Sequence, residues 1–281
     1  MPLSLSALRV YPVKACRGLS LEASEVDRFG LRLDRAFMVV GEDDGRFVSQ
    51  REEPRLALVA TELSAEALTL SAPGAGSVSV ALDAAAGGPR RTVQVWRHQG
   101  DGLDQGEAAA RWLSQLLGRR LRLVRTPPDH ARRVNPEFAA EPAWTSFSDG
   151  YPFLVLSEAS LAGLNRRLPA PLPMERFRPN LVVRGAEPHA EDGWRRIRIG
   201  ELELALVKPC ERCVVTTVDP STGERSGPEP LRTLARYRRS GEGVLFGQNA
   251  VARGTGRLAV GMAVEVLETQ PPPVFERADG G

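Results

Sequence analysis

Hydrophobic and polar residues alternate in short runs along most of the chain, and turn-forming residues separate the runs. Such alternation is the pattern of a half-buried β-strand. Many short strands at regular spacing favour a β-sandwich or a β-barrel. The ranges expected to form strands are 4–13, 21–26, 36–40, 56–61, 67–71, 77–82, 92–96, 121–124, 151–156, 194–206, 214–218, 244–249 and 258–267.

Three stretches depart from this pattern and predict helices. The range 104–117 carries apolar residues at helical spacing, and Gly118 supplies a stop after it. Ser157 is a suitable N-cap for a helix over 158–167, and a short basic helix is expected over 230–238. The predicted fold class is therefore mainly β with a few helices (α+β).

A polar, proline-bearing stretch at 127–145 indicates a long loop or a linker between domains. We expect a β-rich first domain over 1–125 and a second domain over 126–268. The proline- and glycine-rich segment 269–281 is expected to be a disordered tail.

Composition narrows the class of protein. The chain has 281 residues, 42% of them hydrophobic and 26% charged, which suits a soluble globular protein with a core. A net charge of +2 disfavours a duplex nucleic-acid binder. Three cysteines, an odd number, favour a reducing compartment, and we expect a cytoplasmic protein. No apolar run approaches the ~20 residues of a membrane helix, so no membrane is expected as a partner.

The clearest chemical signal is a pair of cysteines, Cys210 and Cys213, three positions apart. Lys208 precedes the pair and Arg212 lies inside it. Neighbouring cations lower the pKa of a thiol and favour the thiolate, which is both a nucleophile and a soft metal ligand.

Four interpretations of this pair compete. A zinc site needs four ligands, and only Cys16 and three scattered histidines remain as candidates. A thioredoxin-type dithiol needs a helix at the first cysteine, but Pro209 precedes the pair and 214–218 predicts a strand. One cysteine can be the single protein ligand of a metal cofactor, or both can be small buried hydrophobes. The motif alone leaves these last two open.

Only two lysines occur, Lys14 and Lys208, and both stand beside cysteines. A lysine is a compact point charge that suits a phosphate, whereas arginine replaces it elsewhere in this chain. The loop 14–18 has two cations and free backbone N–H groups, as an anion cradle requires. Arg178 is a further cation able to fork onto phosphate or carboxylate oxygens.

Six motifs then occur in a fixed order: Y-P-V-K-A-C-R-G at 11–18, G-L-R-L-D-R at 30–35, S-E-A-S at 157–160, F-R-P-N at 177–180, C-E-R-C-x-x-T-T-V-D-P-x-T-G at 210–223 and F-G-Q-N at 246–249. Their order and spacing resemble the MOSC-domain family, most of all the branch of the mitochondrial amidoxime-reducing component and its bacterial relatives. The resemblance covers most of the chain.

The resemblance implies an N-terminal MOSC β-rich domain followed by the MOSC β-barrel domain. It also implies a molybdenum–pterin cofactor held by one cysteine, which is Cys213 in the matching motif, with Cys210 as a bystander. Pyridoxal phosphate binding is a further expectation that it carries. The positions that match cofactor contacts are Lys14, Arg35, Arg178, Asn180, Arg212 and Asn249.

The activity that the resemblance implies is a molybdenum-cofactor-dependent reduction of N-hydroxylated compounds: amidoximes, hydroxylamines and N-hydroxylated bases. Cys213 would be catalytic as the metal ligand, and Thr216 and Asp219 are candidates for a proton path. The expected partners are a small-molecule substrate and a separate electron-donor protein, ferredoxin- or cytochrome b5-like, with its reductase. The alternatives are a carrier of the cofactor or of persulfide sulfur without its own turnover, and a scaffold that has lost its cofactor.

Overall fold

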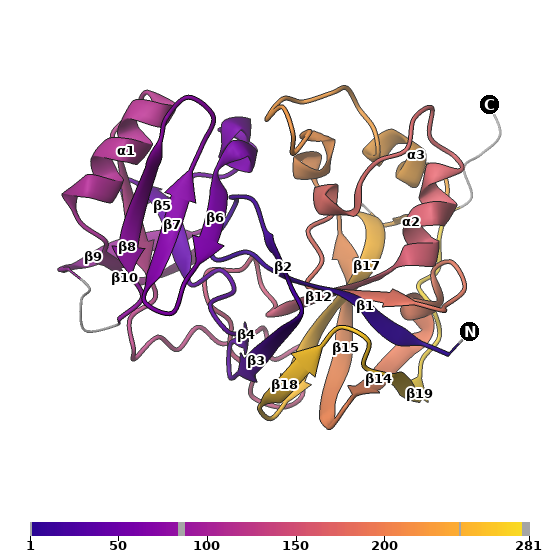
Figure 1. Cartoon of the computed structure of the whole chain (residues 1–281). Coiled ribbons are helices and arrows are strands. Elements are labelled where there is room, and N and C mark those ends of the chain that lie inside the picture. The colour runs from indigo at the N-terminus through magenta and orange to yellow at the C-terminus, as the bar shows by residue number, and fades with distance from the viewer. Residues whose placement is uncertain (1, 84–87, 242, 277–281) are drawn as a thin grey trace.

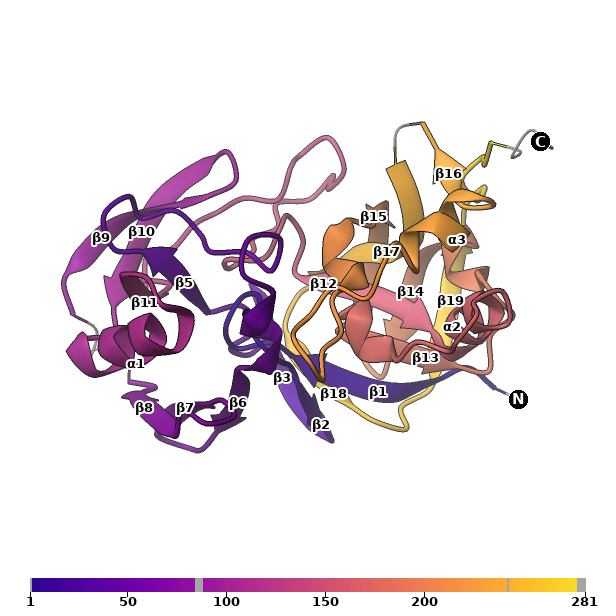
Figure 2. The ribbon, with the colours of Figure 1, turned by 90° about the horizontal axis from the view of Figure 1, so that it is seen from above.

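A computed structural model of the protein describes residues 2–83, 88–241 and 243–276 (Figure 1). Its described strands form four sheets, and the elements gather into two lobes that lie side by side (Figure 2). The prediction of a mainly β fold with a few helices is confirmed.

The larger lobe is built on a nine-stranded sheet with the strand order β19-β14-β15-β17-β12-β13-β1-β2 and with β16 paired to β17. The strands β12 and β13 are parallel, because the helix α2 (Glu158–Asn165) carries the chain back between them. The strands of this sheet are β1 (Ser4–Val10), β2 (Leu19–Leu21), β12 (Phe153–Ser157), β13 (Leu181–Arg184), β14 (Trp194–Ile199), β15 (Leu202–Glu211), β16 (Arg239–Ser240), β17 (Gly243–Arg253) and β19 (Val264–Thr269).

The smaller lobe packs two antiparallel sheets and the helix α1 (Glu107–Leu117) around a core of its own. A third small sheet joins β18 to β3 and β4. The bounds are β3 (Ala23–Asp27), β4 (Gly30–Leu31), β5 (Phe37–Gly41), β6 (Ala60–Leu63), β7 (Ala67–Ser71), β8 (Ser77–Ala81), β9 (Arg90–Val95), β10 (His98–Asp104), β11 (Leu121–Arg125) and β18 (Gly256–Ala259).

The remaining helices are short. They are α3 (Leu231–Ala235) and the 3-10 helices η1 (Pro54–Leu58), η3 (Met174–Arg176), η4 (Ala190–Gly193) and η5 (Val214–Thr217). Every helix in the described part of the chain is too short or too polar to span a bilayer.

The two predicted helix ends with a specific residue are confirmed. Gly118 follows α1 in the left-handed region at φ 71°, where glycine carries no Cβ penalty. The Oγ of Ser157 accepts the N–H of Ser160 at 3.0 Å and so caps α2.

Several local predictions differ from the structure, and the predicted strands 21–26 and 258–267 are each divided between two strands. The range 214–218 forms the 3-10 helix η5 instead of a strand, and 56–61 is split between η1 and β6. The strand β10 was not expected, because its polar, glycine-bearing sequence lacks alternation. The predicted tail lies partly outside the described residues, at 277–281. Within the described part, the backbone N–H of Glu276 donates to Arg239 O at 2.9 Å.

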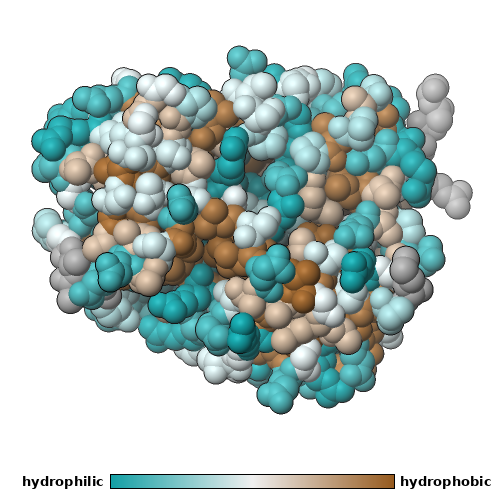
Figure 3. Space-filling model, in the orientation of Figure 1, coloured by the Kyte–Doolittle hydropathy of each residue, from teal (hydrophilic) through white to brown (hydrophobic). Residues whose placement is uncertain are grey.

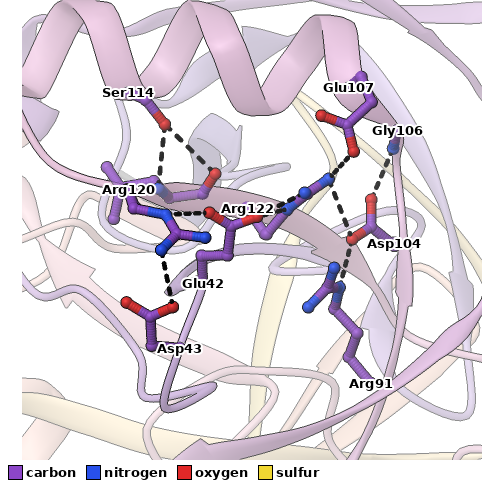
Figure 4. A network of polar contacts seen from close by, with 10 residues as sticks. Glu42, Asp43, Arg91, Asp104, Gly106, Glu107, Ser114, Arg120 and Arg122 are labelled. Carbon is purple, nitrogen blue, oxygen red and sulfur yellow. Dashed lines mark hydrogen bonds and ion pairs between the residues drawn. The ribbon is translucent and has the colours of Figure 1, made fainter.

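A polar network joins α1 to the sheet beneath it (Figure 4). Arg122 on β11 reaches Glu42 at 2.5 Å and Glu107 at 2.5 Å, so one guanidinium links the hairpin after β5 to the first turn of the helix. The Oγ of Ser114 accepts the N–H of Leu121 at 3.0 Å. These contacts fix the orientation of the smaller lobe's outer helix.

The first strand of the chain, β1, belongs to the larger lobe, although much of the sequence directly after it forms the smaller lobe. β1 pairs with β13 and β2, so it completes the large sheet although its sequence lies in the predicted first domain. After β1 the chain passes through the core of the smaller lobe, where Val13 and Cys16 are buried, and then returns to the large sheet as β2. The loop that follows β1 therefore lies where the two lobes meet, and this loop carries Lys14.

Candidate functional site

A cavity of about 340 Å³ lies between the lobes. The smaller lobe supplies its aromatic and polar wall through Phe47, Gln50 and Trp96. The larger lobe supplies the loop 148–151, the segment 177–180 and the cysteine segment 208–216. The site residues predicted from the sequence that line this cavity are Lys14, Arg35, Arg178, Asn180, Arg212, Cys213, Thr216 and Asn249.

Lys14 is a buried cation in this cavity, with 5% of its surface exposed. Its Nζ lies 2.6 Å from the carboxylate of Asp149 and 4.7 Å from the centre of the Phe47 ring. Burial lowers the pKa of Lys14 to about 8, although the contact with Asp149 acts in the opposite direction. The amine is therefore charged at neutral pH and loses its charge under mildly alkaline conditions.

Asp149 joins the two lobes at the cavity. Its Oδ1 accepts hydrogen bonds from Lys14 at 2.6 Å and from the indole Nε1 of Trp96 at 2.8 Å. Its side chain is 78% exposed, and although partial desolvation at the cavity acts to raise the pKa of this carboxyl, the charge and hydrogen bond of Lys14 hold that pKa well below its usual range. Asp149 is therefore a carboxylate at neutral pH.

Two arginines stack on one tyrosine. The guanidiniums of Arg35 and Arg178 lie 4.3 Å and 4.2 Å from the centre of the Tyr11 ring. The backbones of Arg35 and Arg178 have positive φ angles of 48° and 56°, a conformation that residues other than glycine rarely adopt. Arg178 also donates to the carbonyl of Cys16 at 2.7 Å. Burial lowers the pKa of Arg178, yet a guanidinium stays charged. The strained backbone and the shared ring hold both cations toward the cavity.

Asn180 holds Arg35 in place. Its Oδ1 accepts hydrogen bonds from Arg35 at 2.9 Å and from the backbone N–H of Leu154 at 3.2 Å. Its Nδ2 donates to Arg9 O at 3.1 Å. With 1% of its surface exposed and its amide engaged on both sides, Asn180 acts chiefly as a positioning residue.

Cys213 lies at the start of η5, on the cavity wall, and its thiol is free. The carbonyl of Cys213 accepts hydrogen bonds from Thr216 through the backbone N–H at 3.1 Å and the hydroxyl at 3.0 Å. These bonds fix the backbone that presents the sulfur. Thr216 thus lies at the site, with its hydroxyl committed to Cys213.

Arg212 faces the other cysteine. Its Nη1 lies 2.9 Å from the sulfur of Cys210, and its Nη2 donates to Phe177 O at 2.7 Å. Burial raises the pKa of Cys210, and Arg212 partly offsets that rise. Lys208 pairs with Glu211 at 3.2 Å. Of the two cations, only Arg212 acts on Cys210, and it does not outweigh the effect of burial on the pKa of that thiol.

The structure does not bring Asp219 into the cavity. Its Oδ2 accepts from Arg176 at 2.9 Å, and its Oδ1 accepts from the backbone and hydroxyl of Ser221. The hydrogen bonds from Ser221 lower the pKa of Asp219. Asp219 therefore organises the turn beyond η5. Asn249 lies on the cavity wall, where its Nδ2 donates to Pro209 O at 3.4 Å.

Trp96 and Asp149 are two of the cavity residues that the sequence did not single out. Trp96 is 40% exposed, which is unusual for so large an apolar side chain, and it stands at the end of β9. Asp149 lies between the predicted linker 127–145 and the predicted strand 151–156, in a short stretch for which the sequence predicts no element. An isolated carboxylate or indole has no diagnostic spacing, so a single sequence offers no signal for either residue.

The geometry also tests the earlier interpretations of the cysteine pair. Cys210 lies within β15, so it does not start a helix as a thioredoxin-type site requires. Across the described residues, no group of three or more His, Cys, Asp or Glu is placed to hold a metal ion. A metal bound to Cys213 would need most of its ligands from a cofactor. Three cations for an anionic end, Lys14, Arg35 and Arg178, line the same cavity, so a molybdenum–pterin fits the residues present.

Comparison with known proteins agrees with this arrangement. The chain matches the family model of the MOSC N-terminal beta barrel domain over residues 3–120 and that of the MOSC domain over residues 142–265. Fold and site thus define a MOSC-domain protein.

Its curated relatives narrow the class. The human mitochondrial amidoxime-reducing component 1 is 37% identical, over 94% of this chain and 83% of its own length. The mouse protein of that name is 37% identical over 94% and 82%, and the bovine mitochondrial amidoxime reducing component 2 is 36% identical over 84% and 72%. The chain belongs to the amidoxime-reducing component branch of the MOSC family, as the six motifs predicted.

Proposed function

We propose that this protein is a molybdenum-cofactor-dependent oxidoreductase that reduces N-hydroxylated compounds such as amidoximes, hydroxylamines and N-hydroxylated bases. The observation that carries the proposal is one free thiol, Cys213, on the wall of a cavity that also gathers three cations. The names of the relatives, which are amidoxime-reducing components, support the reductase over a carrier without turnover.

In this proposal the chain's own residues hold the two ends of the cofactor. Cys213 is the single protein ligand of the metal, and a soft thiolate suits that role. Lys14, Arg35 and Arg178 hold the terminal phosphate, with Asn180 positioning Arg35. When bound, the molybdenum–pterin supplies the two-electron chemistry that removes oxygen from an N-hydroxyl group.

The substrate side of the cavity is aromatic and acidic. Trp96 and Phe47 meet edge to face with ring centres 5.5 Å apart and form a rigid apolar wall. Asp149 is a carboxylate beside that wall, and it can accept N–H groups of an amidoxime or amidine. We propose that a planar aromatic substrate lies on Trp96 with its polar group toward Asp149. Reduction of an amidoxime consumes two electrons and two protons and gives the amidine and water.

The remaining expectations follow from the same site. Lys14 and Lys208 are the only lysines that could form a Schiff base with pyridoxal phosphate, and both are paired with carboxylates. We therefore propose that Lys14 contacts the phosphate of the pterin cofactor, and not that it forms a Schiff base with pyridoxal phosphate. Three free cysteines suit a reducing compartment, so we place the protein in the cytoplasm. A separate electron-donor protein, ferredoxin- or cytochrome b5-like, completes the reaction.

The test is metal analysis and turnover on matched variants. Wild type and Cys210→Ser are expected to bind molybdenum and to reduce benzamidoxime with a chemical reductant, whereas Cys213→Ser is expected to lose both. No turnover by wild type with molybdenum fully bound would exclude the reductase. A persulfide on Cys213, together with no molybdenum, would favour the sulfur carrier.

A further inference from the structure

A second cavity of about 380 Å³ adjoins the candidate site and has no role in the proposed reaction. Its walls come from β1, from the loop before β2, from η1 and η3, and from the turn after η5. It shares Gln50, Arg178 and Val215 with the first cavity, so Arg178 lines both. We call it the arginine cavity, because it is lined by Arg9, Arg17, Arg176 and Arg178.

The arginine cavity has an excess of positive charge. Four guanidiniums line it, and Glu175 is the single carboxylate among its lining residues. Arg9 pairs with Glu175 at 2.6 Å and Arg176 pairs with Asp219 at 2.9 Å, so two of the four positive charges are balanced locally. Arg17 and Arg178 make their described hydrogen bonds to backbone carbonyls, of Pro220 and Cys16, which do not neutralise them. An anion would supply the missing counter-charge.

Arg176 is the most deeply buried of the four, with 5% of its surface exposed. Its terminal nitrogens donate to Thr217 O at 2.9 Å, to Asp219 at 2.9 Å and to Ser226 at 3.0 Å. These bonds hold the guanidinium rigidly. Its Nε is buried and, within the described part of the chain, has no hydrogen-bond partner. A buried donor without a partner costs about 1–3 kcal/mol, so a rigid donor of this kind favours binding an acceptor.

Arg9 repeats this feature on the neighbouring strand. Its Nη1 is committed to Glu175, whereas its Nε is also buried without a partner among the described residues. Arg17 stands on a different wall and is exposed. Arginines from β1, from η3 and from the loop before β2 thus line one volume, as the binding of a tetrahedral oxyanion requires.

The other walls are apolar. They include Tyr11, Ala57, Val215 and Val218. Gly18 allows the close approach of Tyr11, since a Cβ at residue 18 would lie 2.4 Å from the tyrosine ring. The arginine cavity therefore combines cationic donors with room for a compact organic group.

We propose that the arginine cavity binds a small phosphomonoester, with the phosphate on Arg9, Arg17 and Arg176 and the organic group against Val215. Because Arg178 lines both cavities, an anion here lies close to the cradle that holds the cofactor's phosphate. Occupation of the arginine cavity is therefore expected to weaken retention of the cofactor. The binding itself does not depend on the proposed reaction.

The experiment uses the full chain without cofactor and titrates it with inorganic phosphate and with phenyl phosphate by calorimetry at constant ionic strength. Arg9→Met and Arg17→Met are expected to weaken both ligands at least about fivefold, as the loss of one charge-assisted hydrogen bond implies. Arg111→Met is the control, because Arg111 is an exposed arginine on α1 that lines neither cavity. Cys213→Ser is expected to bind as wild type does.

The variant Lys14→Met distinguishes phosphate binding in the candidate site from binding in the arginine cavity, because Lys14 lines only the candidate site. Weaker affinity in Arg9→Met and Arg17→Met supports the proposal, whether Lys14→Met keeps its full phosphate affinity or also loses binding in the candidate site. Weaker affinity in Lys14→Met alone would place the phosphate in the candidate site and overturn it. Equal heats with chloride, or equal affinity in all variants, would overturn it as well.

Discussion

Trp96 is held in a conformation that its own backbone disfavours. Its φ is 54°, and for a bulky residue this backbone conformation costs about 1–3 kcal/mol. It persists only where contacts with neighbouring residues offset that cost. Three neighbours do so: the carboxylate of Asp149, the ring of Phe47 and the guanidinium of Arg51, which lies 4.6 Å from the centre of the indole. The aromatic wall of the candidate site is thus rigid before any substrate arrives.

Replacement of Trp96 is expected to change substrate preference. Trp96→Ala should raise KM for benzamidoxime by about fivefold or more, the value of one aromatic contact, and leave acetamidoxime nearly unchanged. Trp96→Phe keeps an aromatic ring and should restore most of the preference. Steady-state kinetics with the two substrates tests this, and an equal loss for both would show that Trp96 only supports the fold.

Lys14 makes the site sensitive to pH. The pKa of its amine is lowered to about 8, so its charge is present below that pH and disappears above it. Retention of an anionic cofactor is expected to fall by up to about tenfold between about pH 7 and about pH 9. Molybdenum remaining after gel filtration at several pH values measures this.

The matched control for that titration is Lys14→Met. It should retain less molybdenum than wild type at neutral pH and show no step near pH 8. The arginines of the site stay charged throughout this range, so they cannot produce the step. An identical pH profile in both proteins would exclude Lys14 as its origin.

Sequence motifs identified the residues of this site that have a family pattern, and the structure gathers Cys213, Lys14 and Arg178 around one cavity. They did not identify Asp149 or Trp96, because each acts through a contact between the lobes. Asp219 is a site candidate that the structure does not bring to the cavity wall. Its position close to Cys213 in sequence suggested a shared role, but the turn directs its carboxylate toward Arg176.

At the scale of elements, local hydrogen bonds and partner strands decided the cases that sequence patterns missed. The β-branched run 214–218 predicted a strand. Instead, Thr216 donates a hydrogen bond to the carbonyl of Cys213, and the run forms the 3-10 helix η5. The strand β10 has little alternation and owes its form to pairing with β9 and β11. A local sequence pattern covers only neighbouring residues, so it does not report pairing with other strands such as β11.

The end of α1 gives a test at the same scale. Gly118 has a left-handed backbone, and a Cβ there would meet no atom within 4 Å. Gly118→Ala is therefore expected to lower the free energy of unfolding by about 1 kcal/mol through backbone strain alone. Gly118→Asn should cost less, because asparagine tolerates this conformation. Urea denaturation compares the two, and equal losses would contradict the stated cause.

At the scale of the whole molecule, the supply of electrons becomes the question. The sequence has no dinucleotide-binding fingerprint. NADH alone is therefore expected to give no benzamidoxime reduction with the cofactor-loaded protein. Addition of a cytochrome b5 or a ferredoxin with its reductase should restore turnover, and NADH consumption follows it. Turnover with NADH alone would show that the chain accepts hydride directly.

The pairing of β1 with β13 has a consequence for biosynthesis. Ser6 and Val182, which bond across these strands, are 176 positions apart. At about 5–20 residues per second, the ribosome delivers β13 roughly 10–35 seconds after β1. During that interval the apolar residues of β1 have no partner strand, because β13 has not yet been synthesised. The nascent chain is therefore expected to need a chaperone, or early folding of the smaller lobe, to shield β1 from solvent.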